Sequence, residues 1–200
     1  FTTSSSRSND PGAFVMRHQK VTRMVLAAMF AAITAVASQI IFPLGFTPVP
    51  FSCAMIAIYL CGALLDPRTA FLSQLAYLLA GAAGAPVFSY FSGGLHKLAG
   101  PTGGYLFVYP LMALAVSAVT RRWGRGFFKY CAAMTMALAL CYAVGTAWFM
   151  FVSNTGLAAS LVACVAPFVP MDAVKILLSA ALASALSRAL GKARLLGTGI

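Results

Sequence analysis

The sequence predicts an all-α fold, an integral membrane bundle of six transmembrane helices. Three observations predict it: apolar residues make up 61% of the chain, charged residues only 8%, and long apolar runs alternate with short basic clusters. An average soluble domain carries about 25% charged residues, so this chain has too few to cover a soluble globule. The composition therefore argues against a soluble enzyme and against a disordered regulator.

The net charge of +11 does not point to nucleic acid. A nucleic-acid-binding domain carries a basic face on a polar body, whereas the basic residues here stand in short clusters between apolar runs. Such clusters are typical of membrane topology signals, so we expect the lipid bilayer, and no nucleic acid, among the partners.

Six apolar runs predict the transmembrane helices, since a bilayer core about 30 Å thick needs about 20 helical residues to cross. They cover residues 24–42, 51–65, 69–83, 105–120, 127–152 and 170–190. The second and third runs are short, so we expect tilt or local thinning of the bilayer. A further apolar run, residues 157–166, is too short to cross and predicts an interfacial or re-entrant helix.

The polar and apolar parts of the chain indicate its domains. Residues 1–20 are polar and predict a disordered cytoplasmic tail, and residues 21–195 predict one membrane domain of six helices. An alternative exists for the first run, because the basic residues before it and Ala35-Val36-Ala37 near its end resemble a signal peptide. That alternative changes the first helix but not the membrane assignment.

The distribution of basic residues predicts the topology. With the N-terminus in the cytoplasm, twelve of the fourteen lysines and arginines lie on the cytoplasmic side, as the positive-inside rule requires. We therefore expect a multi-pass protein of the cell (plasma) membrane with both termini cytoplasmic.

Three segments then converge on the outer side, residues 43–50, 84–104 and 153–169. The second is long and rich in glycines and aromatic residues, unlike a disordered linker. A glycine-rich backbone can approach a ligand closely, and aromatic rings supply apolar walls. We interpret it as a lid over a ligand, with a purely structural cap as the alternative.

Asp172 and Lys175 are the only acid and base within the hydrophobic part of a predicted span. Each costs about 2.5–3.5 kcal/mol at the bilayer centre on insertion scales, and their spacing of three places both on one helix face. One interpretation is a self-neutralising pair that positions the helix end. The other is a polar floor for a small ligand, because the carboxylate accepts hydrogen bonds and the ammonium donates them.

Other candidate residues give weaker signals. Lys97 can attract an anionic ligand tail or be a plain solvated lysine. Tyr90 and Trp148 can line a pocket, whereas we assign Tyr142 to an interfacial aromatic belt. Ser52 either contacts the ligand or caps the second span.

The sequence has no recognisable catalytic set. No histidine lies within a span, no two carboxylates pair, and no ATP-binding loop is present. The five cysteines are read as buried free thiols, without a histidine at metal-ligand spacing. We therefore expect neither an enzyme, nor a metal site, nor a cofactor.

Several motifs resemble those of the BioY family. They are YLLAGAAGAPVF at residues 77–88, SGG at residues 92–94, GPTGGYL at residues 100–106 and PFVPMDAVK at residues 167–175. The resemblance extends over about residues 24–190 with the motifs in the family's order. BioY proteins are six-helix, biotin-binding substrate-binding (S) components of energy-coupling factor (ECF) transporters, with the vitamin site near the outer face.

The resemblance implies roles for individual residues. Asp172 and Lys175 would hold the polar head of biotin, which is the transported ligand and not a cofactor. Phe88, Ser92, Gly93, Gly94 and Tyr105 would belong to the loop that covers it. In the first helix, Ala28 and Ala32 resemble the small-residue surface that docks the transmembrane T component, which couples to two ATPase subunits.

One position departs from the family pattern. After Val49-Pro50 the family tends to have a threonine and, two residues on, a glutamine, where this chain has Ser52 and Ala54. The hydroxyl is retained and the amide is not. Either another residue replaces that contact, or the affinity for the ligand differs, or the chain serves another small vitamin-like molecule.

Overall fold

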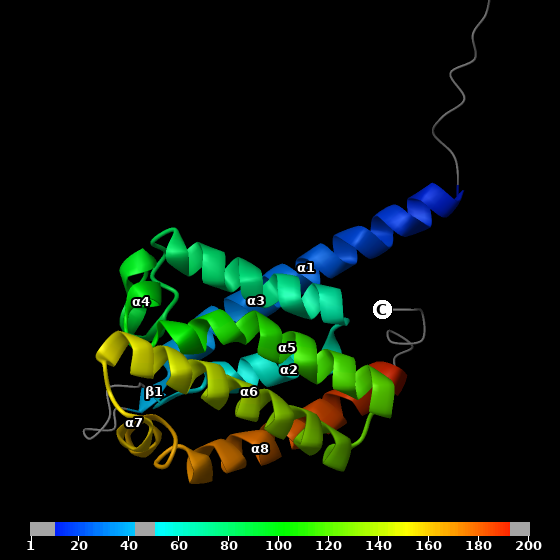
Figure 1. The fold of residues 1–200 in the computed structure, drawn as a ribbon. Helices are drawn as coiled ribbons and strands as arrows, with labels where there is room; N and C mark the ends of the chain where they lie inside the picture. Colours follow the sequence, from blue (N-terminus) through cyan, green and yellow to red (C-terminus); the bar gives the residue numbers. More distant parts are fainter. Residues whose placement is uncertain (1–10, 43–50, 193–200) are drawn as a thin grey trace, which may run out of the picture.

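The computed structural model describes residues 11–42 and 51–192 as a bundle of long helices with short elements at one end (Figure 1). Helix α1 (Pro11–Gln39) is followed by two short strands, β1 (Ile41–Phe42) and β2 (Phe51–Ser52), and by α2 (Ala54–Leu64) and α3 (Pro67–Ala82). The 3-10 turn η1 (Ser89–Phe91) and α4 (Leu95–Ala99) lead into α5 (Gly103–Trp123). Helices α6 (Phe127–Ser153), α7 (Leu157–Cys164) and α8 (Val169–Lys192) complete the order.

Each predicted apolar run contains a helix, and the short run at residues 157–166 forms α7. The start of the chain differs from the prediction, because α1 begins at Pro11 and residues 11–20 are helical. Proline is tolerated in the first turn of a helix, and charged side chains such as Arg17 and Lys20 do not oppose helix formation. Residues 1–10, the rest of the predicted tail, lie outside the described part.

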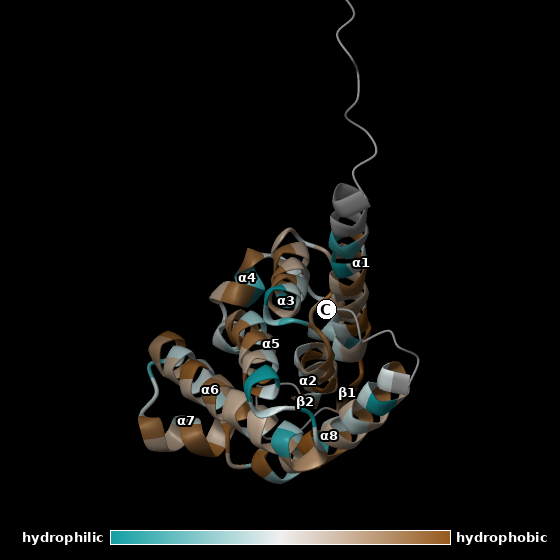
Figure 2. Ribbon diagram, turned by 90° about the vertical axis from the view of Figure 1, so that its right-hand side faces the viewer, coloured by the Kyte–Doolittle hydropathy of each residue, from teal (hydrophilic) through white to brown (hydrophobic). Residues whose placement is uncertain are grey.

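The surface of the described bundle is apolar, as a lipid-facing surface is. Helices α1, α5, α6 and α8 are long and apolar enough to cross a membrane, whereas α2 is a shorter apolar helix. Large aliphatic side chains point outward from several helices, among them Leu72, Leu79, Leu111 and Leu177. A soluble monomer rarely exposes so much contiguous apolar surface. Hydrophilic residues gather instead toward the end of the bundle that faces the viewer in Figure 2.

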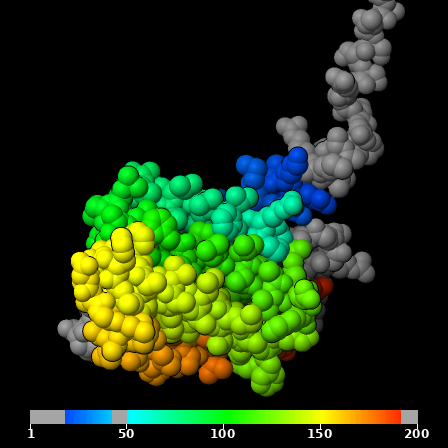
Figure 3. Space-filling view, viewed as in Figure 1, coloured from blue at the N-terminus to red at the C-terminus, as the bar shows by residue number. Residues whose placement is uncertain are grey.

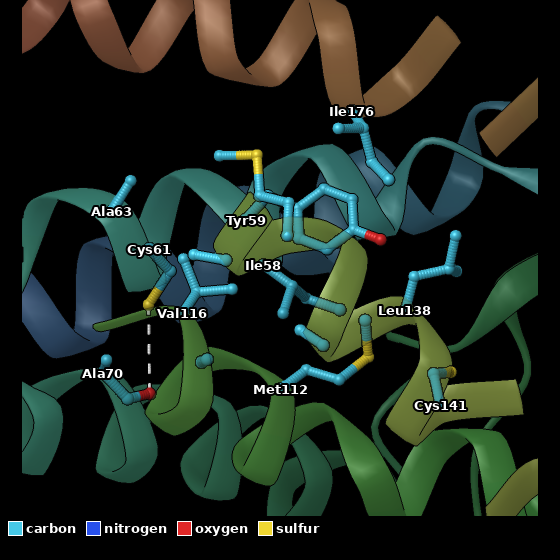
Figure 4. Close-up of a cluster of buried hydrophobic side chains, with 14 of the residues drawn as sticks. Ile58, Tyr59, Cys61, Ala63, Ala70, Met112, Val116, Leu138, Cys141 and Ile176 are labelled. Carbon is cyan, nitrogen blue, oxygen red and sulfur yellow. Dashed lines mark hydrogen bonds between the residues drawn. The ribbon is translucent and has the colours of Figure 1, made fainter. Parts of the chain in front are cut away.

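The interior combines apolar packing with hydrogen bonds between helices. Side chains from α2, α5, α6 and α8 meet around Tyr59 and Met112 (Figure 4). Ser117 Oγ on α5 donates to the Leu65 carbonyl, and Ser73 Oγ on α3 donates to the Ala27 carbonyl on α1. In lipid such bonds hold helices together where hydrophobic attraction between them is weak. All five cysteines are free thiols, as predicted, but only Cys61, Cys141 and Cys164 are buried, whereas Cys53 and Cys131 are half-buried.

Asp66 caps the N-terminus of α3. Its carboxylate accepts hydrogen bonds from the Thr69 backbone N–H and hydroxyl, and Arg23 Nε lies 3.9 Å from Oδ1. Burial alone raises the pKa of this carboxyl, but the Thr69 hydrogen bonds and the Arg23 charge outweigh it and hold the pKa below its ordinary value of 3.8. The cap therefore depends on an ionised carboxylate.

Of the three segments predicted to converge, residues 84–104 and 153–169 lie at one end of the bundle (Figure 1). Strands β1 and β2 pair antiparallel, with Ile41 opposite Ser52, and lie at the same end as α4 and α7 (Figure 1). Residues 43–50 between the strands are outside the described part. In the space-filling view α6 and α7, yellow-green to yellow, cover the near face beside this end (Figure 3).

Candidate functional site

The first turn and a half of α8 carries a buried ion pair. Lys175 Nζ lies 3.1 Å from Asp172 Oδ1, and the two residues are only 7% and 2% exposed. Pro170 suits this first turn, and the Asp172 backbone N–H donates to the Phe168 carbonyl. The local sequence thus starts the helix so that both charges point into the bundle.

Aromatic groups surround the pair. Tyr142 on α6 donates from its hydroxyl to Asp172 Oδ2 at 2.6 Å. The Lys175 ammonium lies 3.6 Å from the centroid of the Phe51 ring, a cation–π geometry, and Phe51 stacks on Phe168 at 6.2 Å. Asp172 Oδ1 is buried and pairs with the Lys175 ammonium. A carboxylate oxygen has more than one lone pair, so Oδ1 can also accept an N–H from a ligand.

Two adjoining cavities open above the pair. One of about 50 Å³ is lined by Asp172 and Lys175 together with Tyr142, Phe51, Met55, Cys164 and Phe168. The other, of about 150 Å³, is lined by residues of the loop that follows α3 and by Lys97 and Thr102. Ser52, Tyr105 and Tyr109 line both cavities, so the two cavities lie side by side.

The loop wall of the larger cavity is residues 87–92, which we call the lid. Phe88 and Ser92 form a small β-bridge, each backbone N–H donating to the other residue's carbonyl. The Phe88 ring is 2% exposed and packs edge-on against Tyr77, with centroids 5.6 Å apart. Ser89, Tyr90 and Ser92 complete the wall.

Gly93 and Gly94 shape the turn after the lid and do not line either cavity. A side chain at Gly93 would overlap with the Ala85 carbonyl, and Gly94 has a φ of +93°, which favours glycine. The Gly94 N–H donates to the Gly81 carbonyl. The two glycines therefore contribute through the path of the backbone.

The other sequence candidates separate into three groups. Ser52, Tyr105, Phe88, Ser92, Lys97 and Tyr90 line a cavity together with the ion pair or next to it. Trp148 does not, because its indole N–H donates to the Gly100 carbonyl and holds the loop before α5. Ala28 and Ala32 are exposed on α1, away from the cavities.

The assignment of Tyr142 to an interfacial belt is wrong, since its hydroxyl binds the buried Asp172 carboxylate. The sequence interpretation also missed Phe51, Tyr77, Tyr109 and Phe168. A spacing of four places Tyr109 on the face of Tyr105 and Phe168 near Asp172, and this signal was available. Phe51 and Tyr77 come from other elements and carried no such signal.

Among the described residues, no three histidine, cysteine or acidic side chains gather into a group that could hold a metal ion. The polar groups of the site are instead a carboxylate, an ammonium and several hydroxyls. This set suits an organic ligand that has both hydrogen-bond donors and acceptors.

Comparisons with known proteins agree with this geometry. The family model described as "BioY family" matches residues 8–192. The chain is 34% identical over 156 residues to a probable biotin transporter BioY of Pyrococcus horikoshii, covering 78% of this chain and 90% of that one. It is 34% identical over 166 residues to the biotin transporter BioY of Thermotoga maritima, covering 83% and 96%.

Two solved structures are also similar. The S-component for biotin from an ECF-type ABC transporter superposes with a TM-score of 0.79 and 25% identity, covering 86% of this chain and 93% of that one. The S component of another bacterial ECF transporter has a TM-score of 0.50 and 18% identity, covering 86% and 97%. The second likeness concerns the fold alone.

Proposed function

Because the chain belongs to the BioY family, we propose that it is the biotin-specific S component of an ECF-type vitamin uptake transporter. It captures biotin on the outer side of the membrane and delivers it inward with an ATP-driven partner module. It is a transport protein and not an enzyme. The observation that carries the proposal is the buried Asp172–Lys175 pair, which lines a cavity next to the one walled by the lid.

The polar head of biotin matches the pair chemically. Its ureido ring has two N–H donors and one carbonyl acceptor. We place one ureido N–H on Asp172 Oδ1, beside its contact with Lys175, and the ureido carbonyl on Lys175 Nζ. The thioether ring then contacts Met55 and Phe168 in the smaller cavity.

The carboxylate tail of biotin extends into the larger cavity. Lys97 and Thr102 line it, as do Ser89 and Ser92 of the lid. These are cationic or hydroxyl groups, which donate to a carboxylate. We therefore propose that Lys97 attracts the tail.

Equilibrium binding of labelled biotin to detergent-purified protein tests the assignment. A hydrogen bond to a charged group contributes about 1.5–3 kcal/mol, so Asp172→Asn and Lys175→Met should each weaken binding about 10- to 100-fold. Asp66→Asn and Lys129→Met make the same chemical changes outside the cavities and should leave the affinity unchanged. If neither site substitution changes the affinity for biotin, the assignment of Asp172 and Lys175 to the binding site is wrong.

The alternative ligand is another small vitamin-like molecule, as the exchange at Ala54 would allow. Ala54 is buried at the start of α2 and does not line either cavity, so its identity does not oppose biotin. Direct binding of labelled biotin, thiamine, riboflavin and lipoate to the purified protein separates the two. Binding of one of the last three, with no binding of biotin, would favour the alternative.

We also propose that α1, α2, α3, α5, α6 and α8 are six transmembrane helices, with residues 21–195 as the substrate-binding domain. Both termini then lie in the cytoplasm of the cell and the cavities open outward. The 11 residues of α2 and 16 of α3 require the bilayer to thin or the segments to tilt. Labelling by a membrane-impermeant maleimide in a cysteine-free variant, at Leu95→Cys but not at Arg122→Cys, is the expected pattern in intact cells.

The partner module, a T component with two ATPase subunits, docks in this proposal on the exposed Ala28 and Ala32 of α1. Small residues at a spacing of four let another helix approach closely. Ala32→Trp should therefore abolish co-purification with the module while biotin binding is retained. Leu111→Trp, a bulky change at an exposed position of α5, should leave the complex intact.

A further inference from the structure

The last two residues of α1 hold the lid, although neither lines either of the two cavities described above. Ser38 Oγ donates to the Val87 carbonyl at 2.6 Å. The Gln39 side-chain amide donates from Nε2 to the Val87 and Phe88 carbonyls at 3.3 and 3.1 Å. Its Oε1 accepts from the Phe91 backbone N–H at 2.9 Å. One amide group thus binds both the first and the last part of the lid.

The lid backbone needs such support. Tyr90 and Phe91 have φ angles of +62° and +49°, in the left-handed region that non-glycine residues adopt at a cost. Their rings are 59% and 72% exposed, so packing of these rings does not hold them in place. The hydrogen bond from the Phe91 N–H to Gln39 therefore helps to stabilise the strained turn.

The hydrogen bonds converge on the wall of the cavity. The Val87 carbonyl also accepts from the Tyr77 hydroxyl at 3.2 Å, and Tyr77 itself lines the larger cavity beside Phe88. The lid is therefore tied to α1 on one side and to α3 on the other. If α1 moves relative to α3, these bonds to one carbonyl cannot all persist.

We propose that Gln39, assisted by Ser38, is a latch that sets the rate at which the bound ligand leaves the cavity. It is a positioning residue, because it acts through the lid and does not touch the ligand. The proposal deepens the function given above and rests on it for the identity of the ligand. It makes the end of α1 the place where the lid is controlled.

Dissociation of labelled biotin from the full-length chain, chased with unlabelled biotin, tests the latch. Gln39→Met keeps the volume of the side chain and removes its three hydrogen bonds to the lid, so the dissociation rate should rise at least about tenfold. Ser38→Ala should raise it less. Ile40→Ala changes the next residue, which is exposed, and should leave the rate unchanged.

Hydrogen exchange in the ligand-free protein gives a readout that does not depend on biotin. Gln39→Met should speed exchange in a peptide spanning residues 88–92, with unchanged protection in α5 and α6. Unchanged dissociation together with unchanged exchange would overturn the latch. Faster exchange in a protein that never binds biotin would instead overturn the proposed function and leave the latch standing.

Discussion

Replacing Tyr142 by phenylalanine isolates one contact of the site. The change removes a hydroxyl that donates to Asp172 Oδ2 at 2.6 Å and leaves the ring in place. In the native chain this bond fixes the carboxylate so that Oδ1 faces Lys175 and the cavity. Without it, one oxygen of a buried carboxylate loses a partner and the group is free to rotate.

The size of the effect follows from the charge of the acceptor. Hydrogen bonds to charged groups contribute about 1.5–3 kcal/mol, twice or more the value for neutral pairs. Rotation of the carboxylate toward Lys175 recovers part of this energy, so we take the lower end of that range. The affinity for biotin should then fall about tenfold, and the melting temperature of the ligand-free protein should also fall.

Calorimetric titration with biotin and thermal unfolding in the same detergent measure both quantities. The matched control is Tyr130→Phe, on the same helix, because the buried Tyr130 hydroxyl has no hydrogen-bond partner among the described residues. Its removal should cost neither affinity nor stability. If Tyr142→Phe behaves like Tyr130→Phe, the carboxylate is not oriented from α6 and the reasoning fails.

Three further outcomes are expected. In Gly145→Ala the new methyl group overlaps with the Tyr105 ring, so the free energy of unfolding should fall by about 1–3 kcal/mol and biotin should bind more weakly. In the control Gly156→Ala the new methyl group meets nothing within 4 Å, so stability and binding should not change. The folded-state pKa of Asp66 is lowered, so its contribution to stability is complete above the unfolded-state pKa near 3.8 and disappears as the pH falls through the folded-state pKa. Asp66→Asn should remove this part of the acid sensitivity in melting curves. Lys97→Gln should weaken binding of biotin about two- to fivefold at low salt but not binding of its uncharged methyl ester. Equal losses for both ligands would exclude a contact with the tail.

How far the sequence predicts the site depends on how local each feature is. The Asp172–Lys175 pair was predictable because two charges in an apolar run are costly and their spacing alone places them on one helix face. The partners of that pair were not predictable, because Tyr142 and Phe51 come from α6 and β2. The latch was not predictable either, since Gln39 meets Phe91 across 52 positions of the chain.

The sequence by itself determined where the helices lie, because apolar runs and basic flanks act on each segment separately in a membrane. It also determined that α8 carries a buried ion pair. Only the tertiary structure decided which rings enclose that pair, where the cavities open and what holds the lid. Those features depend on how helices cross and in which register they meet. The spacing of residues along one helix does not determine which neighbouring helix a given side chain will face.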